Sequence, residues 1–530
     1  MRLGERMYRD GILPSGETMQ SMIRGDVEVS GSAFSCSSCH MYSGLGSVEG
    51  GVITPPTNGE KLYKPYYRPP SLNEIPDRDG RIHYAKTTQE RPAYTRATLA
   101  TALRDGVDPT GEILNDVMPR YLLSESDMNI MISYLESLSA APSPGASHEG
   151  FTFATIITED VSATDRDAFM APLDYFIDER NDQVKKYKHF IDMGFTPTVD
   201  MKYAFRAAEL EIWELKGPPD TWQRQLTAYY AKKPVFAVLG GISNQSWQPI
   251  HNFCEAERLP CLFPTTDFPV TSGDSFYTFY LNKGYFQEGE AAARYLNRQE
   301  GLTDGTRIVQ IVQDSPAGKA LADGFQASWG EAGRRPAASL TLTAAQLADP
   351  KELARIVAGQ KPEILLLWSD AGSLPQLPSL LALQSAPQQV FVSATLLGKQ
   401  TASIAEAIRS KVYITYPYRL TPYVGPKEGG FDLRLPVLAR AADFGEKRIS
   451  SRNLMMLIQS VYQGLNLLYD NLYRDYLLDL LSMQMDRIVR DYERISFGPG
   501  QRFVSKGCYI LQLGPGKDPA LIPRSEWVIQ

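Results

Sequence analysis

Two cysteines and a histidine stand together near the start of the chain, in the run Cys36-Ser37-Ser38-Cys39-His40. This pattern is typical of c-type haem attachment, in which the two thiols form thioether bonds and the adjacent imidazole ligates the iron. A redox dithiol also uses Cys-x-x-Cys, but it stands where a strand leads into a helix. Here the motif opens a glycine-rich loop. The sequence predicts one covalent haem c, attached at Cys36 and Cys39, with His40 as the proximal iron ligand.

The chemistry of such a haem depends on the sixth iron ligand. A methionine thioether raises the reduction potential and favours an electron carrier. Met118 is the best candidate, because it stands on a loop before a helix and Pro119 restricts the backbone after it. His83 is the competing ligand and would give a lower potential. An open sixth position is the third alternative, and a catalytic haem protein would need it.

A second group of candidate residues follows short apolar runs later in the chain. In an open α/β sheet, a ligand binds beyond the carboxyl ends of the strands. Backbone N–H groups at a helix start suit a ligand carboxylate, and an acid such as Asp267 or Asp314 could hold an ammonium group. Each of these residues could instead be a helix cap or a turn residue. The candidate solute-binding residues are Ser243, Asn244, Ser246, Thr265, Asp267, Asp314, Ser369 and Asp370.

Helices must position the haem motif. The sequence predicts an opening helix from Leu3 to Asp10, a short helix from Thr98 to Gly106, and a strong helix from Ser124 to Leu138. Ser124 and Asp127 resemble a capping box at the start of the last helix. One face of that helix is apolar at helical spacing. The residues of this face are Met128, Met131, Ile132, Leu135 and Leu138.

The rest of the chain alternates short apolar runs with helical stretches, which predicts parallel sheets with helices on both faces. A proline-bearing run from Ala140 to Ser147 separates the helical N-terminal pattern from this alternating pattern and predicts a linker. We therefore expect a helical N-terminal domain over residues 1–140, a linker over 141–150 and an α/β domain over 151–530.

The composition places further limits on function. The 530 residues carry a formal charge of -7, so nucleic acid is not an expected partner. No stretch of about 18 apolar residues predicts a membrane span. Haem attachment implies export to the periplasm, although no apolar leader follows Met1. In that oxidising compartment Cys254 and Cys261 could form a disulfide, or they could be two buried thiols.

Residues 3–140 resemble the class I c-type cytochromes. The resemblance rests on the opening helix with Gly4 and Tyr8, on the haem motif, on the run from Met118 to Tyr121, and on the closing helix with Tyr134. It implies that Gly4 and an aromatic side chain of the first helix pack against the last helix near Tyr134. This chain departs from the family by a long insertion between the motif and Met118.

Residues 151–530 resemble the type I periplasmic solute-binding proteins, the branched-chain amino-acid receptor group. The resemblance implies a two-lobed α/β fold with parallel sheets. Lobe 1 would cover about 151–285 and 450–495, and lobe 2 about 286–449 with the C-terminal strands. The runs that carry the resemblance are 238–246, 259–266, 310–318, 454–468, 496–500 and 507–511.

Together these features predict a periplasmic mono-haem cytochrome that transfers single electrons and is coupled to a solute- or partner-binding module. The expected partners are a periplasmic dehydrogenase or another cytochrome, and a small polar solute. Two alternatives stay open: a transporter-type solute receptor with haem as a redox sensor, and a peroxidase-like catalytic haem protein. Met118 favours an electron carrier or binding protein over an enzyme.

Overall fold

The computed structural model of the chain comprises two compact units. Unit 1 contains Met1–Glu149, Thr196–Ala204 and Gly464–Leu481, and unit 2 contains the rest. Within the part that the structure describes, no helix has the length and apolar character needed to span a membrane. The structure describes residues 2–23, 27–49, 52–67, 90–196, 205–271, 275–303, 305–421, 451–484, 492–498 and 501–529. His83, the competing candidate for the iron ligand, lies outside these ranges.

Unit 1 is built around the contact between helices α1 (Arg2–Asp10) and α5 (Glu125–Ser137). A methyl group added to Gly4 would lie 2.5 Å from Tyr134 Cβ, so the two helices approach closely at this glycine. The rings of Tyr8 and Tyr134 lie 5.5 Å apart. This confirms the expected packing of Gly4 and an aromatic side chain of the first helix against Tyr134.

Unit 1 contains the expected helices and, in addition, short strands that the sequence did not predict. Strands β2, β1 and β7 form an antiparallel sheet, in which Ser21 pairs with Tyr121. This sheet links the segment before the haem motif to the segment after Met118. The remaining N-terminal elements are β1 (Gln20–Ile23), β2 (Val27–Ser30), α2 (Cys36–His40), β3 (Val48–Glu49), β4 (Val52–Ile53), α3 (Gly59–Leu62), β5 (Tyr66–Tyr67), β6 (Glu90–Arg91), α4 (Arg96–Asp105) and β7 (Arg120–Tyr121).

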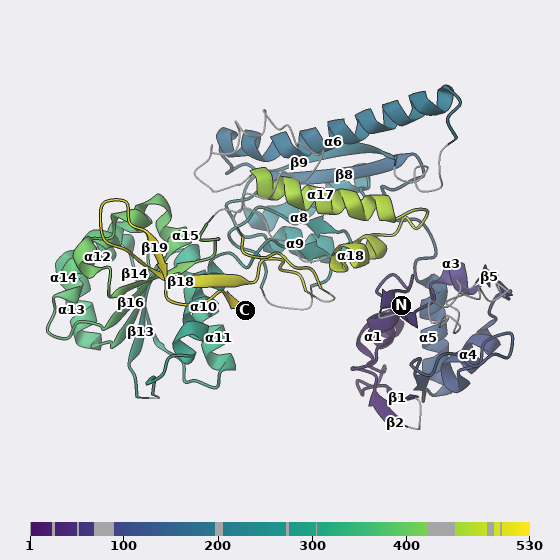
Figure 1. Cartoon of the computed structure of the whole chain (residues 1–530), viewed down its shortest axis with the longest axis horizontal. Helices are drawn as coiled ribbons and strands as arrows, with labels where there is room; N and C mark the ends of the chain where they lie inside the picture. Colours follow the sequence, from purple (N-terminus) through teal and green to yellow (C-terminus); the bar gives the residue numbers. More distant parts are fainter. Residues whose placement is uncertain are drawn as a thin grey trace, which may run out of the picture. The chain divides into compact units, whose positions relative to one another are not determined.

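A segment from far along the chain completes unit 1. It contains the end of α17 (Ser451–Leu467) and nearly all of α18 (Arg474–Ser482) (Figure 1). Ser143 N donates to the Leu472 carbonyl oxygen at 2.8 Å, and Arg474 N donates to the Ser143 hydroxyl at 3.1 Å. The expected linker is thus held by hydrogen bonds, and the compact units divide the chain differently from the predicted domains.

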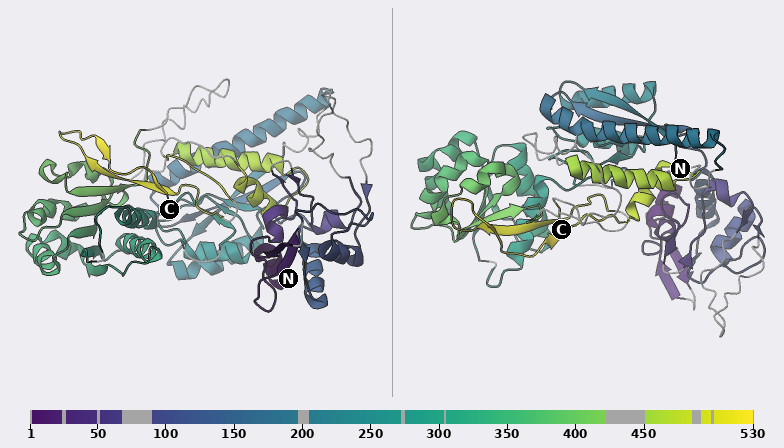
Figure 2. Two further views of the ribbon diagram at one scale, coloured as in Figure 1. Left: turned by 60° about the horizontal axis from the view of Figure 1, so that its bottom comes forward. Right: turned by 45° about the horizontal axis from the view of Figure 1, so that its top comes forward.

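The first sheet of unit 2 has the strand order β12-β11-β10-β8-β9 and is parallel throughout. Phe153 on β8 contacts Phe176 on α6, which in turn contacts Tyr462 on α17. Ala154 and Ile156 belong to the apolar core that includes residues of α8 and α9. Helices therefore cover both faces, as predicted (Figures 1 and 2). The elements are β8 (Gly150–Thr158), α6 (Ala163–Asp192), β9 (Ala207–Leu215), α8 (Trp222–Lys232), β10 (Ala237–Leu239), α9 (Gln248–Ala256), β11 (Cys261–Leu262) and β12 (Thr278–Phe279).

The second sheet of unit 2 has the order β14-β13-β15-β16-β17-β18-β19. It is parallel from β14 to β17, and the C-terminal strands β18, β19 and β20 add antiparallel pairs. Its main elements are α10 (Tyr285–Asn297), β13 (Ile308–Gln313), α11 (Pro316–Glu331), β14 (Ala338–Leu342), α12 (Ala344–Ala348), α13 (Pro350–Gln360), β15 (Ile364–Trp368), α14 (Leu377–Leu381), β16 (Gln389–Ser393), α15 (Ala394–Leu397), β17 (Val412–Tyr416), β18 (Gly507–Leu513), β19 (Leu521–Pro523) and β20 (Val528–Ile529).

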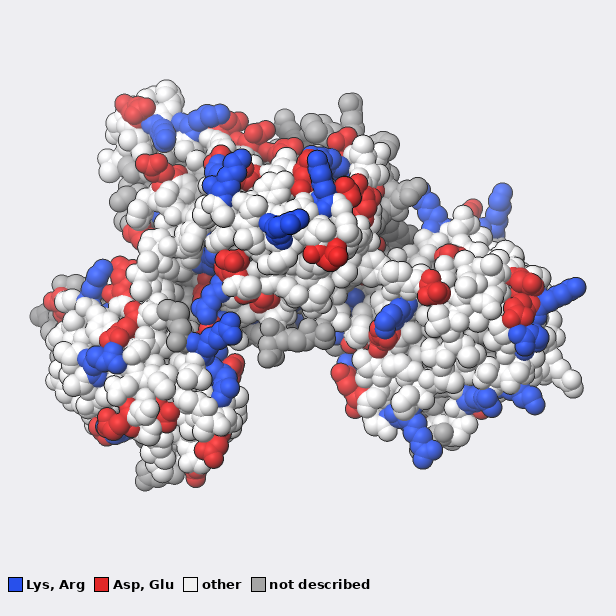
Figure 3. Space-filling model, turned by 180° about the vertical axis from the view of Figure 1, so that it is seen from behind, with Lys and Arg blue, Asp and Glu red and all other residues white. Residues whose placement is uncertain are grey.

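Charged side chains of both signs are interspersed on the face of the molecule drawn in Figure 3. Among the described residues of that face, basic side chains thus stand near acidic ones.

Candidate functional site

The five residues of the Cys-x-x-Cys-His motif form the short helix α2. Cys36 and His40 are buried, and Cys39 is exposed. The Ser37 hydroxyl donates to the Arg9 carbonyl oxygen at 3.0 Å, which ties the motif to α1. Burial raises the pKa of the Cys36 thiol to about 11. Both thiols and the imidazole thus lie within little more than one helical turn, as attachment to a single haem requires.

The ring of His40 is oriented by one hydrogen bond. Its Nδ1 lies 2.8 Å from the Pro55 carbonyl oxygen. Because a carbonyl oxygen can only accept, Nδ1 carries the proton and Nε2 keeps its lone pair. Burial lowers the pKa of His40 to about 4, against the opposing effect of this hydrogen bond. The imidazole is therefore neutral, with one nitrogen ready to bind a metal.

Backbone hydrogen bonds shape the loop that carries Met118. Met118 N donates to the Asn115 carbonyl oxygen at 2.9 Å, and Val117 N donates to the Asn115 side-chain oxygen at 3.0 Å. The Arg120 guanidinium donates to the carbonyl oxygen of Met118 and, at 3.3 Å, to that of Leu114. Met118 itself is half-buried against the apolar core of unit 1. The methionine is thus held on a defined turn just before β7.

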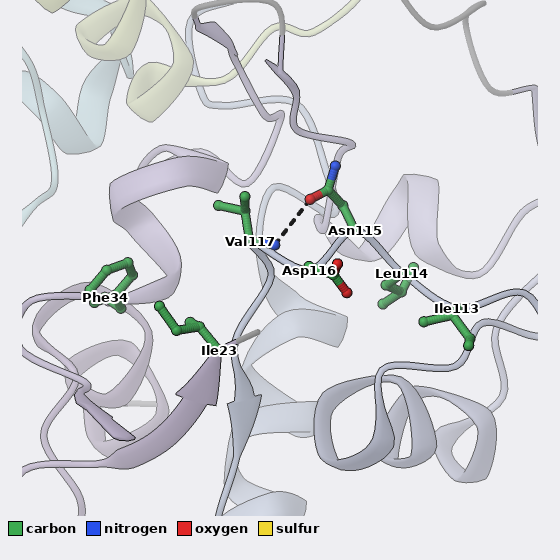
Figure 4. A pocket seen from close by; sticks show the side chains of 7 residues that line it. All are labelled: Ile23, Phe34, Ile113, Leu114, Asn115, Asp116 and Val117. Carbon is green, nitrogen blue, oxygen red and sulfur yellow. Dashed lines mark hydrogen bonds between the residues drawn. The ribbon is translucent and has the colours of Figure 1, made fainter. Parts of the chain in front are cut away.

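A cavity of about 560 Å³ is lined by residues that flank both the haem motif and the methionine loop (Figure 4). Phe34 stands two residues before Cys36, and the run from Ile113 to Val117 ends just before Met118. Most of the lining side chains are apolar, but the lining includes none of Cys36, Cys39, His40 and Met118. The lining residues are Ile23, Phe34, Ile113, Leu114, Asn115, Asp116 and Val117.

The predicted solute-binding residues of the first sheet come together at one edge. Ser243, Asn244 and Ser246 follow β10, and Thr265 and Asp267 follow β11. Ser243 N donates to the Thr265 carbonyl oxygen at 3.2 Å, which joins the two loops. This edge is formed by the carboxyl ends of parallel strands, where ligands bind in open α/β sheets.

Several polar atoms of Ser243, Asn244 and Ser246 already have partners within the lobe. Asn244 N donates to Asp160 Oδ2 at 3.2 Å, and Asn244 Nδ2 donates to the Asp160 carbonyl oxygen at 2.8 Å. The Ser243 hydroxyl accepts from Gln245 N at 3.0 Å. The Ser246 hydroxyl accepts from the first N–H of α9 at 3.3 Å. These bonds support the turn and cap roles, and solute contact stays a prediction.

The candidate residues of the second sheet show the same pattern. Gln313 Nε2 donates to Asp370 Oδ2 at 2.8 Å, and Asp370 N donates to Gln313 Oε1 at 2.8 Å. The Ser369 and Ser373 hydroxyls lie 2.5 Å apart. Asp314 is exposed just beyond the end of β13. The structure thus joins Asp370, which follows β15, to Gln313 at the end of β13, so these candidate residues also have local partners.

Family models match both parts of the chain. The model described as cytochrome c matches residues 32–139, a range that includes the haem motif and Met118. The model described as periplasmic binding protein matches residues 206–424, which span strands of both sheets of unit 2. The chain joins a cytochrome c domain to a periplasmic binding protein domain. No curated protein matches it.

Solved structures resemble the binding protein domain in fold. A branched-chain amino acid ABC transporter protein from Thermus thermophilus with bound valine is 13% identical, with a TM-score of 0.47, and covers 72% of this chain and 97% of its own. An amino acid ABC transporter substrate-binding protein from Pseudomonas fluorescens Pf-5 is 12% identical, with a TM-score of 0.46 and coverage of 72% and 96%. A fatty acid ABC transporter substrate-binding protein from Thermomonospora curvata is 14% identical, with a TM-score of 0.43 and coverage of 74% and 95%.

The cytochrome c domain carries covalently attached haem c, and the residues present fit that group. Cys36 and Cys39 would hold it by thioether bonds, and His40 Nε2 would ligate the iron. Bound there, haem supplies reversible one-electron chemistry.

Cys254 and Cys261 are not joined by a disulfide in this structure. Both are fully buried in the apolar core of the first sheet, one on α9 and the other on β11. The alternative reading, two buried thiols, is the one that the structure supports. A buried thiol behaves as a small apolar side chain, which is the role these two have in the core.

Sequence reasoning missed several residues that shape the two sites. Asp160 follows β8 at the same sheet edge as Asn244. Its position just beyond the carboxyl end of a strand could therefore have identified it. Gln313 is the last residue of β13 and pairs with Asp370. Pro55 provides the acceptor for His40 from the connection between β4 and α3, and no local signal marks it.

Proposed function

We propose that this protein is a periplasmic electron carrier with a single haem c, and that its binding protein domain recognises a solute or a protein partner. The observation that carries the proposal is the hydrogen bond from His40 Nδ1 to the Pro55 carbonyl oxygen. It presents a neutral Nε2 beside the two cysteines of α2. An imidazole fixed in this way serves as a permanent iron ligand.

Met118 is proposed as the sixth ligand. Arg120 and Asn115 hold its loop from both ends through bonds to backbone atoms. A ligand loop that is constrained in this way resists displacement, which favours electron transfer over chemistry at an open iron position. The electron donor or acceptor would be a periplasmic dehydrogenase or another cytochrome.

The Met118→Ala variant of the haem-loaded protein tests this assignment. Met–iron ligation gives a weak band at the far-red edge of the oxidised spectrum, an expectation from the resemblance to cytochromes. We expect the band in the wild type and in a control, Met131→Leu, which changes a buried methionine of α5. The alanine variant should lack the band. A band that survives in Met118→Ala would exclude Met118 as the ligand.

A small polar solute is the expected ligand of the binding protein domain, and a partner protein is the second candidate. The second candidate is favoured by the local partners that Asn244, Ser243 and Asp370 already have. Thermal-shift screening with amino acids and small organic acids separates the two, since a solute at 100 times its Kd adds about 2.7 kcal/mol to stability. A stabilising solute that also shifts the haem potential would favour the redox-sensor alternative.

A further inference from the structure

Helix α18 supplies a carboxylate to the loop that follows the haem motif. Asp479 is 2% exposed. Its Oδ1 accepts from Tyr42 N at 3.2 Å, and its Oδ2 accepts from Ser43 N at 2.9 Å. Two successive backbone N–H groups that converge on one carboxylate form a strong, charge-assisted contact. An acid more than 430 positions away in sequence therefore holds the residues directly after His40 and Met41.

The loop held by Asp479 folds back onto the haem motif. Gly46 N donates to the His40 carbonyl oxygen at 3.1 Å, and the Ser47 hydroxyl donates to the Cys39 carbonyl oxygen at 2.9 Å. The Tyr8 hydroxyl donates to the Met41 carbonyl oxygen at 2.8 Å. A change in the backbone of this loop would thus reach the motif through the carbonyl groups of its last two residues.

Other contacts show that α18 is an integral part of the cytochrome unit. Asp475 Oδ2 pairs with Arg9 of α1 at 3.0 Å. The hydroxyl of Tyr473, one residue before α18, donates to Glu60 of α3 at 2.7 Å. Leu477, Leu478 and Leu481 of the helix are buried. The position of Asp479 is therefore determined by the whole helix and not by its own two hydrogen bonds alone.

We infer that Asp479 is a positioning residue of the haem site, which fixes the loop after His40 and keeps a buried carboxylate against that loop. The inference rests on the proposed role of His40 as iron ligand. A buried negative charge within the unit that would hold the haem favours the ferric form, so its removal should raise the midpoint potential. Burial raises the pKa of Asp479 to about 7, against the two N–H bonds, so measurements belong at pH 8.5, where the carboxylate is ionised.

The test compares midpoint potentials of the haem-loaded full chain. We expect Asp479→Asn to raise the potential, because the charge is lost and one acceptor becomes a donor that faces an N–H group. Asp479→Glu keeps the charge and should lie closer to the wild type. Glu125→Gln is the control, since it removes one acidic charge from the same unit at a side chain that is 85% exposed on α5 and pairs with Arg104, away from the loop. Equal potentials in Asp479→Asn and Glu125→Gln would overturn the inference.

A measurement on the wild type keeps the test decisive if the variants do not fold. The amide protons of Tyr42 and Ser43 should be protected from hydrogen exchange, and fast exchange at both would overturn the inference. The far-red band tests the proposed function independently of Asp479. A wild type without the band would exclude Met118 as the ligand, and the effect of Asp479 on the midpoint potential could still be measured.

Discussion

Asn244 and Asp160 are joined by two hydrogen bonds at the carboxyl edge of the first sheet of the binding protein domain. Asn244 N donates to the Asp160 carboxylate at 3.2 Å, and the Asn244 side chain returns to the Asp160 carbonyl oxygen at 2.8 Å. The Thr158 hydroxyl donates to the same carboxylate. The sequence pattern predicts that backbone N–H groups at this edge bind a ligand carboxylate. The N–H group of Asn244 instead donates to the carboxylate of Asp160.

Asp160→Ala should lower the stability of the binding protein domain. The change removes two side-chain hydrogen bonds to an ionised acceptor, each worth on the order of 2 kcal/mol when charged. We expect a fall of about 2–3 kcal/mol in the free energy of unfolding, measured by urea titration of this domain's transition in the full chain. Asp220→Ala, at an exposed acid of the same lobe, is the control and should have almost no effect. Equal stability of the two variants would argue against a structural role for Asp160.

Gly4→Ala should separate helices α1 and α5 of the cytochrome c domain. The new Cβ would lie 2.5 Å from Tyr134 Cβ and 2.9 Å from the Ile130 carbonyl oxygen, and neither neighbour is a flexible chain end. Overpacking of this kind costs about 1–3 kcal/mol. The control is Gly330→Ala on α11, where no atom lies within 4 Å and the helix should gain stability. Thermal unfolding followed by haem absorbance for the first variant and by far-ultraviolet circular dichroism for the second would report opposite shifts.

Gly106→Ala should disturb the methionine loop. Gly106 ends α4 with a φ of 67°, and an added Cβ would lie 1.8 Å from Arg120 Nε. Arg120 must then move away from the Met118 carbonyl oxygen, which weakens the far-red band. Gly111→Ala has the same type of backbone strain, with a φ of 86°, but meets no atom within 4 Å. Both variants lose about 1 kcal/mol from backbone strain, so a loss of the band in Gly111→Ala as well would contradict the role of Arg120.

Local patterns predicted much of the fold. The capping residue Ser124 and the apolar face from Met128 to Leu135 mark α5 correctly, because caps and helical spacing act within a few residues. The strands β13, β15 and β16 are continuous apolar runs, as the sequence pattern predicts for strands covered on both faces. Strand β9 does not fit that pattern, because its residues Ala207–Leu215 mix acids with apolar side chains at the edge of the sheet.

Contacts between distant segments could not be predicted in the same way. Nothing near Asp479 in sequence indicates that it meets Tyr42 and Ser43, since this contact depends on where α18 packs. The haem motif and the candidate ligand Met118 could be identified from the sequence, because the chemistry of these residues limits their roles. The sequence identifies solute-binding residues less well, because Ser, Asn and Asp at strand ends serve equally well as helix caps.

The buried carboxyl group of Glu288 predicts a pH-dependent stability of the binding protein domain. The side chain is fully buried on α10, and Oε2 accepts from the Thr415 hydroxyl at 2.6 Å. Burial raises the pKa of Glu288 from 4.5 to about 7, against hydrogen bonds from Thr395, Thr415 and Ser393. The folded state therefore binds the proton more tightly than the unfolded state. Its contribution to stability is complete below pH 4.5 and is lost as pH rises through 7.

Glu288→Gln should remove this dependence, because the amide cannot ionise and keeps an oxygen that accepts from Thr415. The variant and the wild type should unfold at similar temperatures at pH 5. At pH 8 the variant should be the more stable, by at most about 3 kcal/mol for a shift of this size. The control is Glu331→Gln, at an exposed acid of α11 with 65% of its side chain accessible, which should leave the pH profile unchanged. Thermal unfolding between pH 5 and 8 decides the matter: parallel profiles for wild type and Glu288→Gln would show that the buried carboxyl group does not titrate in this range.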